Sequence, residues 1–157
     1  MRKILLFFIS ILSLNAFAAN SDAVFNCYKQ ANDGPSLPTG DSASKLCAKV
    51  KSDADIKLVF SCYKQVSDAP GLPGASGAAI LCAGIKKEAD ISAVISCYKQ
   101  SSDIPNLPTG DAAATLCASV KSDAQIKSVL NCYKQSDEGQ SLPGGAGAAA
   151  LCAKQKK

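Results

Sequence analysis

The chain has 157 residues, of which 47% are hydrophobic, 6% aromatic and 19% charged, and its formal net charge is +4. This length predicts a single domain. Histidine and tryptophan are absent, and Met1 and Arg2 are the only methionine and arginine, which removes the side chains that proteins most often use for acid/base chemistry and for gripping phosphates. The lysines are spread along the chain, and the modest charge excludes the basic footprint of a nucleic-acid-binding protein.

Residues 1–18 have the pattern of a secretory signal peptide. Two positive charges at Arg2 and Lys3 precede an apolar stretch over 4–14, and residues 16–18 read Ala-Phe-Ala, the small-residue pattern of a cleavage site. The apolar stretch is too short to cross a hydrocarbon core of about 30 Å as a helical anchor. We expect cleavage after Ala18 and, from the short positive start, a bacterial protein destined for the periplasm or the medium, where cysteines oxidise.

A 35-residue period governs the rest of the chain. The motif Cys-Tyr-Lys-Gln occurs four times at this interval, a Leu-Pro pair follows each of these cysteines ten residues later, and Leu-Cys-Ala recurs around a second cysteine series. Units one and three share Leu-Pro-Thr-Gly-Asp, which indicates a duplicated pair. The period predicts a stacked array of supersecondary units. The four units span approximately residues 19–51, 52–86, 87–121 and 122–157.

Each unit has the pattern of a helix hairpin. In the second unit apolar residues recur at helical spacing over 53–66, and a second, small-residue helix is predicted over 76–86. Ser52-x-x-Asp55 and Ser122-x-x-Gln125 resemble capping boxes. The sequence therefore predicts an all-α fold, with four tandem helix hairpins stacked as a short α-solenoid. An irregular disulfide-rich fold is the alternative, and no segment has the alternation of a β-strand.

The loop before each second helix contains proline, which cannot continue a helix. Asp41 and Asp111, which follow Thr-Gly in these loops, are predicted N-caps. The loop motif Leu-Pro-Thr-Gly lacks the residue that a sortase signal has between Pro and Thr, and no membrane tail follows it. We interpret it as loop structure.

Both ends of the array depart from the inner units. Phe17, inside the predicted signal peptide, stands at the position of the capping residues Ser52 and Ser122, and Gln155 replaces the aliphatic residue that the other units carry. Terminal repeats need polar outer faces to remain soluble, so the polar Gln155 in the last helix supports a linear stack.

The eight cysteines permit two symmetric pairing schemes. Pairing between units, as in Cys47 with Cys62, leaves two cysteines over, whereas pairing within units uses all eight. At 1.5 Å per residue, the two cysteines of a unit lie at similar depths in their helices, while a bond across a junction would have to join residues at different depths. The predicted pairs are Cys27 with Cys47, Cys62 with Cys82, Cys97 with Cys117, and Cys132 with Cys152.

Other chemistry finds little support in the sequence. The cysteines are at least 15 residues apart and have no histidine partner, which argues against zinc, and no Cys-x-x-Cys motif suggests redox catalysis. No Ser-x-x-Lys or Gly-x-Ser-x-Gly pattern occurs, and the two glutamates, Glu88 and Glu138, have no evident partner. We predict no catalytic residue, no metal site and no cofactor.

The tyrosine of each Cys-Tyr-Lys-Gln motif has two interpretations. The four could form an exposed ladder of binding aromatics, since tyrosine is favoured at interfaces. The sequence favours core tyrosines with a hydrated hydroxyl, because Tyr63 falls at the centre of the apolar stripe of its helix. The candidate binding residues are Tyr28, Tyr63, Tyr98 and Tyr133.

The repeat resembles Sel1-like and tetratricopeptide arrays, and most of all the bacterial cysteine-rich Sel1-like group. The resemblance rests on the two-helix unit of 35 residues, Tyr63 in the first helix, Leu72-Pro73 in the loop, and Ala78 and Leu81 in the second helix. It covers about residues 20–155. It implies helix pairs carrying disulfides and a role in scaffolding and protein binding.

The leading functional hypothesis is a secreted or periplasmic scaffold that binds another protein or a cell-surface component, with no nucleic acid and no membrane span once the signal is removed. A small secreted effector or inhibitor acting on a competitor or host is the alternative. An enzyme acting on cell-wall material is a third hypothesis, which no residue pattern supports.

Overall fold

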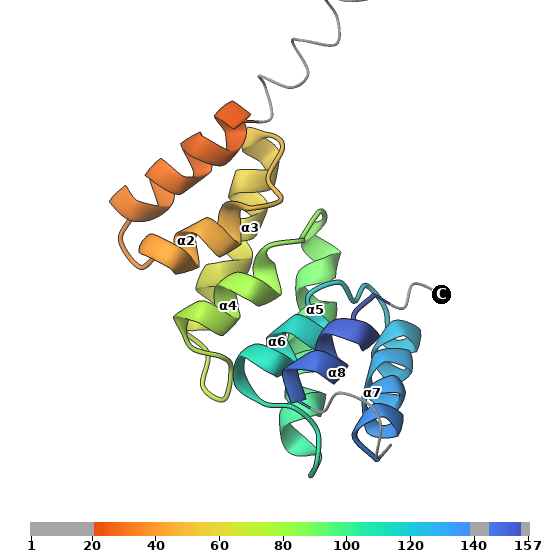
Figure 1. Cartoon of the computed structure of the whole chain (residues 1–157). Helices are drawn as coiled ribbons and strands as arrows, with labels where there is room; N and C mark the ends of the chain where they lie inside the picture. The colour runs from red at the N-terminus through yellow and green to blue at the C-terminus, as the bar shows by residue number, and fades with distance from the viewer. Residues whose placement is uncertain (1–20, 139–144, 155–157) are drawn as a thin grey trace, which may run out of the picture.

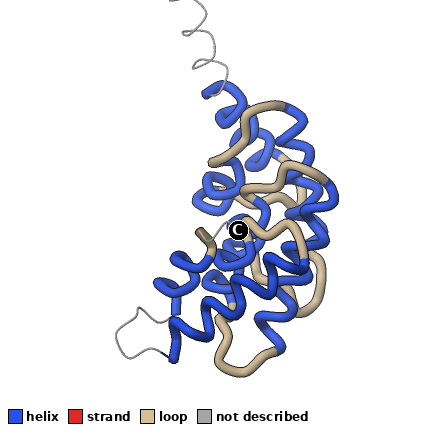
Figure 2. The backbone as a smooth tube through the Cα atoms, turned by 90° about the vertical axis from the view of Figure 1, so that its right-hand side faces the viewer, coloured by secondary structure: helices blue, strands red, loops and turns tan. Residues whose placement is uncertain are grey.

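The computed structural model describes residues 21–138 and 145–154, and the chain forms helices and loops without a β-strand over these ranges (Figure 2). The expected all-α class is confirmed. The predicted signal peptide, its cleavage site after Ala18, and Gln155 lie outside the described residues. None of the helices described is both long enough and apolar enough to cross a membrane.

Long and short helices alternate along the chain. The N-terminal helix covers 21–33 of the described residues. The later long helices are α3 (Asp53–Ser67), α5 (Glu88–Asp103) and α7 (Asp123–Glu138). The short helices are α2 (Gly40–Cys47), α4 (Ala75–Cys82), α6 (Gly110–Cys117) and α8 (Gly145–Cys152).

The short helices form a row through the middle of the molecule (Figure 1). Helix α4 packs against both α2 and α6, and α6 packs in turn against α8. Each of α3, α5 and α7 packs on the short helix that follows it in the chain. The long helices thus lie outside a central row of short ones.

Hydrogen bonds at their first turns fix where α3 and α7 begin. The side chain of Ser52 accepts a hydrogen bond from the Asp55 amide at 3.2 Å, and Ser122 accepts one from the Gln125 amide at 3.4 Å. The side chains of Asp55 and Gln125 each accept a bond, at 2.8 Å, from the amide preceding the cap. The predicted capping by Ser52 and Ser122 is confirmed, whereas the reciprocal bond comes from the residue before the cap and not from the cap's own amide, as it does in a standard capping box.

The starts of α2 and α6 differ from the prediction. Thr39 and Thr109 occupy the N-cap positions, with no side-chain capping bond, and Asp41 and Asp111 lie inside the first turn. The prediction that these aspartates are N-caps was wrong because the helix already begins at the preceding glycine. A carboxylate in the first turn still interacts favourably with the positive end of the helix dipole.

Helix α4 is shorter than the predicted 76–86, since it ends at Cys82. The amide of Ile85 donates to the Cys82 carbonyl at 3.2 Å, which closes a turn in place of continuing the helix. Ile85 nevertheless remains buried. The helix was predicted too long because Ile85, which is buried in the turn after the helix, continues the helical spacing of apolar residues in the sequence.

Small side chains allow the short helices to pack closely. A Cβ atom on Gly77 would lie 2.5 Å from the Cβ of Pro73 and 3.2 Å from the Asp111 carboxylate of the neighbouring helix. The buried part of α4 also includes Ala78 and Ala79. This close approach explains why the second helix of the unit is rich in glycine and alanine.

Candidate functional site

In each of the four units, one disulfide joins the long helix to the short helix. The Cα atoms are 5.7 Å apart in every pair, within the range that a disulfide spans. The bonds link Cys27 to Cys47, Cys62 to Cys82, Cys97 to Cys117, and Cys132 to Cys152. These are the within-unit pairs, and no cysteine remains as a thiol that could bind metal or act as a nucleophile.

The four candidate tyrosines do not share one environment. Tyr63, Tyr98 and Tyr133 are buried in the core, while Tyr28 in the N-terminal helix is partly exposed. Burial raises the pKa of the Tyr63 hydroxyl, and the carboxylate of Asp68 raises it further. The three buried side chains cannot form an exposed ladder, so the core interpretation agrees with their positions.

The part of the chain that the structure describes holds no group of three or more His, Cys, Asp or Glu side chains able to bind a metal ion. The surface of the described residues also has depressions. One depression, of about 560 Å³, runs along α5, and its lining includes acidic and basic side chains, among them Glu88, Lys99 and Asp103. Another of about 430 Å³ lies between the N-terminal helix and the start of α3.

The third depression crosses all four units, and we call it the short-helix groove. Its volume is about 630 Å³, and residues at or just after the C-terminal ends of α2, α4, α6 and α8 line it. The lining consists of Lys45, Ala48, Lys49, Ile80, Ala83, Thr115, Ala118, Ser119, Ala150, Ala153 and Lys154.

The lining repeats with the 35-residue period. One set of equivalent positions is alanine in every unit: Ala48, Ala83, Ala118 and Ala153. A second set varies between units: Lys45, Ile80, Thr115 and Ala150. The first set gives the groove a uniform apolar floor, and the second gives each unit a different side chain to present to a ligand.

Three lysines make the groove positive, and its lining contains no acidic residue. Lys45 and Lys49 lie at the α2 end, and Lys154 lies at the α8 end. Lys45 Nζ donates to Ser76 Oγ at 3.0 Å, and that hydroxyl donates to Asp111 Oδ2 at 2.9 Å, which connects three successive short helices. The ammonium groups of Lys49 and Lys154 make no hydrogen bond or ion pair with the described residues.

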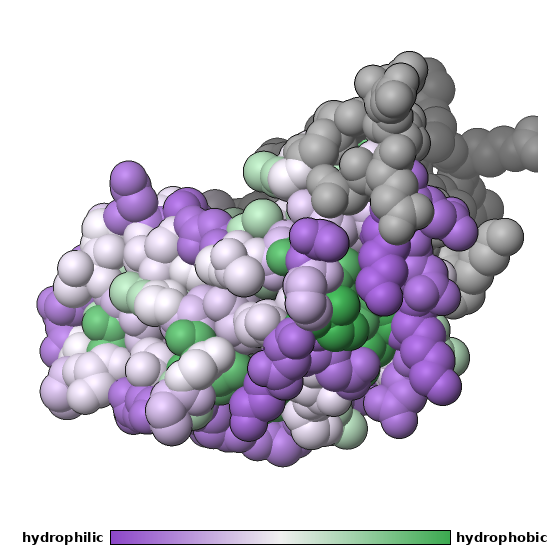
Figure 3. Space-filling model, turned by 90° about the horizontal axis from the view of Figure 1, so that it is seen from below, coloured by the Kyte–Doolittle hydropathy of each residue, from purple (hydrophilic) through white to green (hydrophobic). Residues whose placement is uncertain are grey.

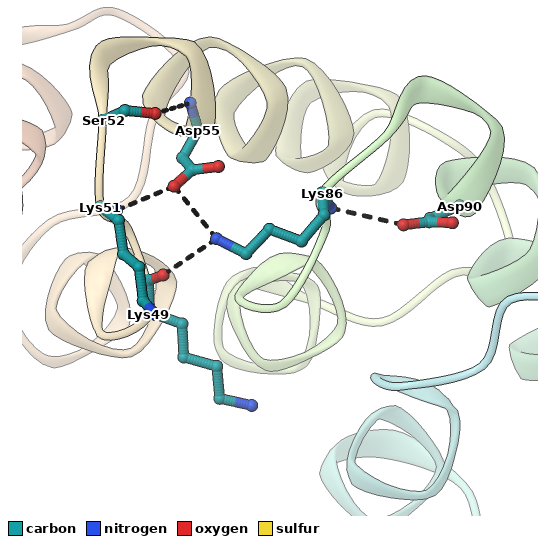
Figure 4. Close-up of polar contacts among 6 residues, drawn as sticks. All are labelled: Lys49, Lys51, Ser52, Asp55, Lys86 and Asp90. Carbon is teal, nitrogen blue, oxygen red and sulfur yellow. Dashed lines mark hydrogen bonds and ion pairs between the residues drawn. The ribbon is translucent and has the colours of Figure 1, made fainter. Parts of the chain in front are cut away.

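A cluster around Asp55 holds the backbone at the α2 end of the groove (Figure 4). Lys86 Nζ lies 3.0 Å from Asp55 Oδ2 and donates to the Lys49 carbonyl at 3.2 Å. In Figure 4 the Lys49 side chain extends away from this cluster. The carbonyl of Lys49 is therefore fixed while its ammonium lies outside the cluster.

The same contacts determine the ionisation of Asp55. Burial opposes the charged form, but the hydrogen bonds from the Lys51 amide and from Lys86, together with the charge of Lys86, keep the pKa of Asp55 below its ordinary value. Asp55 is therefore a carboxylate at neutral pH. It contributes to the structure beside the groove and does not line it.

The short-helix groove was not among the sites predicted from the sequence. The groove forms where one face of each of the four short helices meets the others on the same side of the row. Helical periodicity in the sequence does not determine how separate helices are arranged. A signal was nevertheless present, since alanine follows the second cysteine in all four units. An invariant small residue at the end of a helix is consistent with a surface that must be kept open.

Compared with protein-family models, curated proteins and solved structures, the chain matches none of them. The disulfides, the helix row and the groove therefore carry the functional argument.

Proposed function

We propose that the protein is an exported, disulfide-stabilised scaffold, that its four units stack as a short α-solenoid, and that it binds another protein through the short-helix groove. The observation that carries this proposal is the construction of the groove from equivalent positions in all four units. A surface with such continuity suits an extended ligand that contacts several units in turn.

The chemistry of the groove narrows the class of ligand. Its alanine floor leaves room for small apolar side chains, and Ile80 adds apolar surface. The lysines at both ends favour negative charge. We infer that the ligand is an extended acidic segment of a partner protein, with small residues over the floor and carboxylates near Lys49 and Lys154.

The disulfides support an oxidising compartment for the proposed scaffold. Four disulfides within 157 residues are typical of secreted and periplasmic proteins. This agrees with the predicted signal peptide at residues 1–18 and with the resemblance to cysteine-rich Sel1-like arrays. In that compartment the disulfides add stability that the small core of each two-helix unit does not supply.

A binding measurement tests the proposal. The probe is a synthetic, unstructured peptide of alternating Glu and Ala, titrated against the exported protein at low salt. We expect saturable binding that weakens at least about tenfold in the double variant Lys49→Glu/Lys154→Glu, because two attractive charges become repulsive.

The matched control is Lys57→Glu/Lys127→Glu, which changes the net charge equally at exposed positions outside the groove. The control should retain most of the affinity. Absence of binding to the wild type, or an equal loss in both double variants, would contradict the groove as the binding site.

A further inference from the structure

The first and last units each expose residues that the inner units bury. Leu46, Leu81 and Leu116 are 0% exposed, but Leu151 at the equivalent position of the last unit is 51% exposed. A further unit follows each of the first three in the chain, and Leu151 belongs to the last of the four units. The following unit is therefore what covers this leucine position.

The tyrosine position shows the reverse relation. Tyr63, Tyr98 and Tyr133 are 4–5% exposed, and each belongs to a unit with another before it. Tyr28, in the first unit, is 38% exposed, and Phe25 one turn earlier is 70% exposed. The preceding unit is what covers the tyrosine position.

These end residues define two surfaces. We call Phe25 and Tyr28 the N-terminal face, and Leu151 with the surface around it the C-terminal face. At each junction between consecutive units, the short helix that carries the leucine packs against the following long helix, which carries the tyrosine. These leucines and tyrosines belong to one continuous core, which also includes Leu130, whereas Phe60 and Ile95, the other equivalents of Phe25, are partly buried against it. The two ends of the molecule thus carry the two halves of a contact that the chain already makes three times internally.

We propose that the protein self-associates head to tail, with the N-terminal face of one copy covering the C-terminal face of another. Continuity with the internal junctions identifies a second copy as the occupant, because the equivalent helices already pack on each other at all three junctions. Without Arg2 and Lys3, the chain carries 15 lysines against 13 acidic residues, so repulsion between copies is small.

The end faces also differ from an internal junction, and this limits the affinity. Ser21 is exposed at the position where Ile56, Ile91 and Ile126 are buried. The contact between copies therefore lacks this aliphatic side chain, and at the other end the sequence has Gln155 where the inner units bury Val50, Ile85 and Val120. We expect association in the micromolar range, visible as a dependence on protein concentration.

A head-to-tail contact is heterologous, because two different surfaces meet and both remain available at the ends of the assembly. Sedimentation velocity of the exported protein should show species that grow beyond a dimer as concentration rises. The variants Leu151→Asp and Tyr28→Asp should each remain monomeric alone, since each loses one face.

Mixing the two variants provides the decisive measurement. Each retains the face that the other has lost, so an equimolar mixture should form a dimer and nothing larger. Ser92→Asp, which adds the same charge at an exposed position on α5, should associate like the wild type. Circular dichroism melts of all variants establish that the substitutions leave the fold intact.

Three outcomes would overturn the proposal: a wild type that stays monomeric at all concentrations, a mixture that forms no dimer, or a single variant that associates as well as the wild type. The last outcome would indicate a symmetric contact between like faces. Binding of the acidic peptide is measured separately, so failure of self-association leaves the proposed groove unaffected.

Discussion

Asp55 shows how one side chain can serve two parts of the molecule. Its carboxylate accepts from the Lys51 amide at the start of α3 and pairs with Lys86, which in turn holds the carbonyl of Lys49. The cap of a long helix and the rim of the groove therefore depend on the same charge. Lys86 comes from beyond α4, so the cluster also ties together segments distant in the sequence.

Replacing Asp55 with asparagine should lower the free energy of unfolding by about 1 kcal/mol at neutral pH, because a charged cap and an ion pair are lost. Since the folded pKa is lowered, the contribution is present above the unfolded pKa of about 4 and disappears as pH falls through the folded value. Denaturant unfolding from neutral to acid pH should show the wild type and Asp55→Asn converging in acid. Asp123→Asn, at the exposed start of α7, should not reproduce this convergence.

Equivalent leucines offer a matched pair of core and surface substitutions. Leu81→Ala should lower the free energy of unfolding by about 2–5 kcal/mol, because it leaves a cavity at a fully buried site. Leu151→Ala should cost less than about 1 kcal/mol, because half of that side chain is already exposed. Thermal and denaturant unfolding at dilute concentration measure both. Equal losses would mean that the C-terminal face is covered in the single molecule.

At the scale of elements, the short helices depend on their neighbours. Helix α4 has eight residues of mostly small side chains, and helices of this length are unstable alone in water. Packing against α2, α3 and α6, together with the bond from Cys62 to Cys82, holds it in place. The disulfide stabilises the fold by constraining the unfolded chain, in a segment whose short helix adds little stability of its own.

Removing the disulfide between Cys62 and Cys82 tests how much it stabilises the fold beyond helix packing. The double variant Cys62→Ala/Cys82→Ala should lower the free energy of unfolding by roughly 3 kcal/mol, as expected for a loop of about this size. Guanidinium unfolding under oxidising conditions measures the loss. Adding a reductant to the wild type should have a larger effect, since it opens all four loops. If the double variant were as stable as the wild type, the staple would be redundant with the packing.

The sequence predicted the elements well where local chemistry decides them. The long helix of the second unit begins at Asp53 as expected, because Ser52 accepts from the Asp55 amide in its first turn and Asp55 accepts from the Lys51 amide just before it. The short helix was predicted too long, since Ile85 is buried by packing beyond the helix end. The groove escaped prediction because it arises from the row of four helices, and no single helix contains it.

The whole molecule carries two proposed binding surfaces of opposite character. The groove is positive at both ends and apolar along its floor. The end faces expose apolar side chains. Figure 3, which views the molecule from below relative to Figure 1, shows hydrophobic residues among hydrophilic ones on that side. These differences mean that solution conditions can separate the two interactions.

Ionic strength should affect peptide binding in the groove more than self-association through the end faces. Raising NaCl from about 50 mM to about 500 mM should weaken binding of the acidic peptide several-fold, because salt screens exposed charges. It should not weaken self-association, which rests on apolar burial. Peptide titration and sedimentation velocity in the same buffers compare the two. A parallel fall would indicate that both interactions depend on the lysines.

The placement of the four disulfides has a mechanical consequence. Each bond joins cysteines 20 positions apart inside one unit, and only the 14 residues between one unit's second cysteine and the next unit's first lie outside these loops. Under tension, an opened inner unit would release about 50 Å of extended chain in place of about 120 Å for 35 unlinked residues. The protein would therefore lengthen in short steps and keep the chemical integrity of each helix pair while the contacts between pairs gave way.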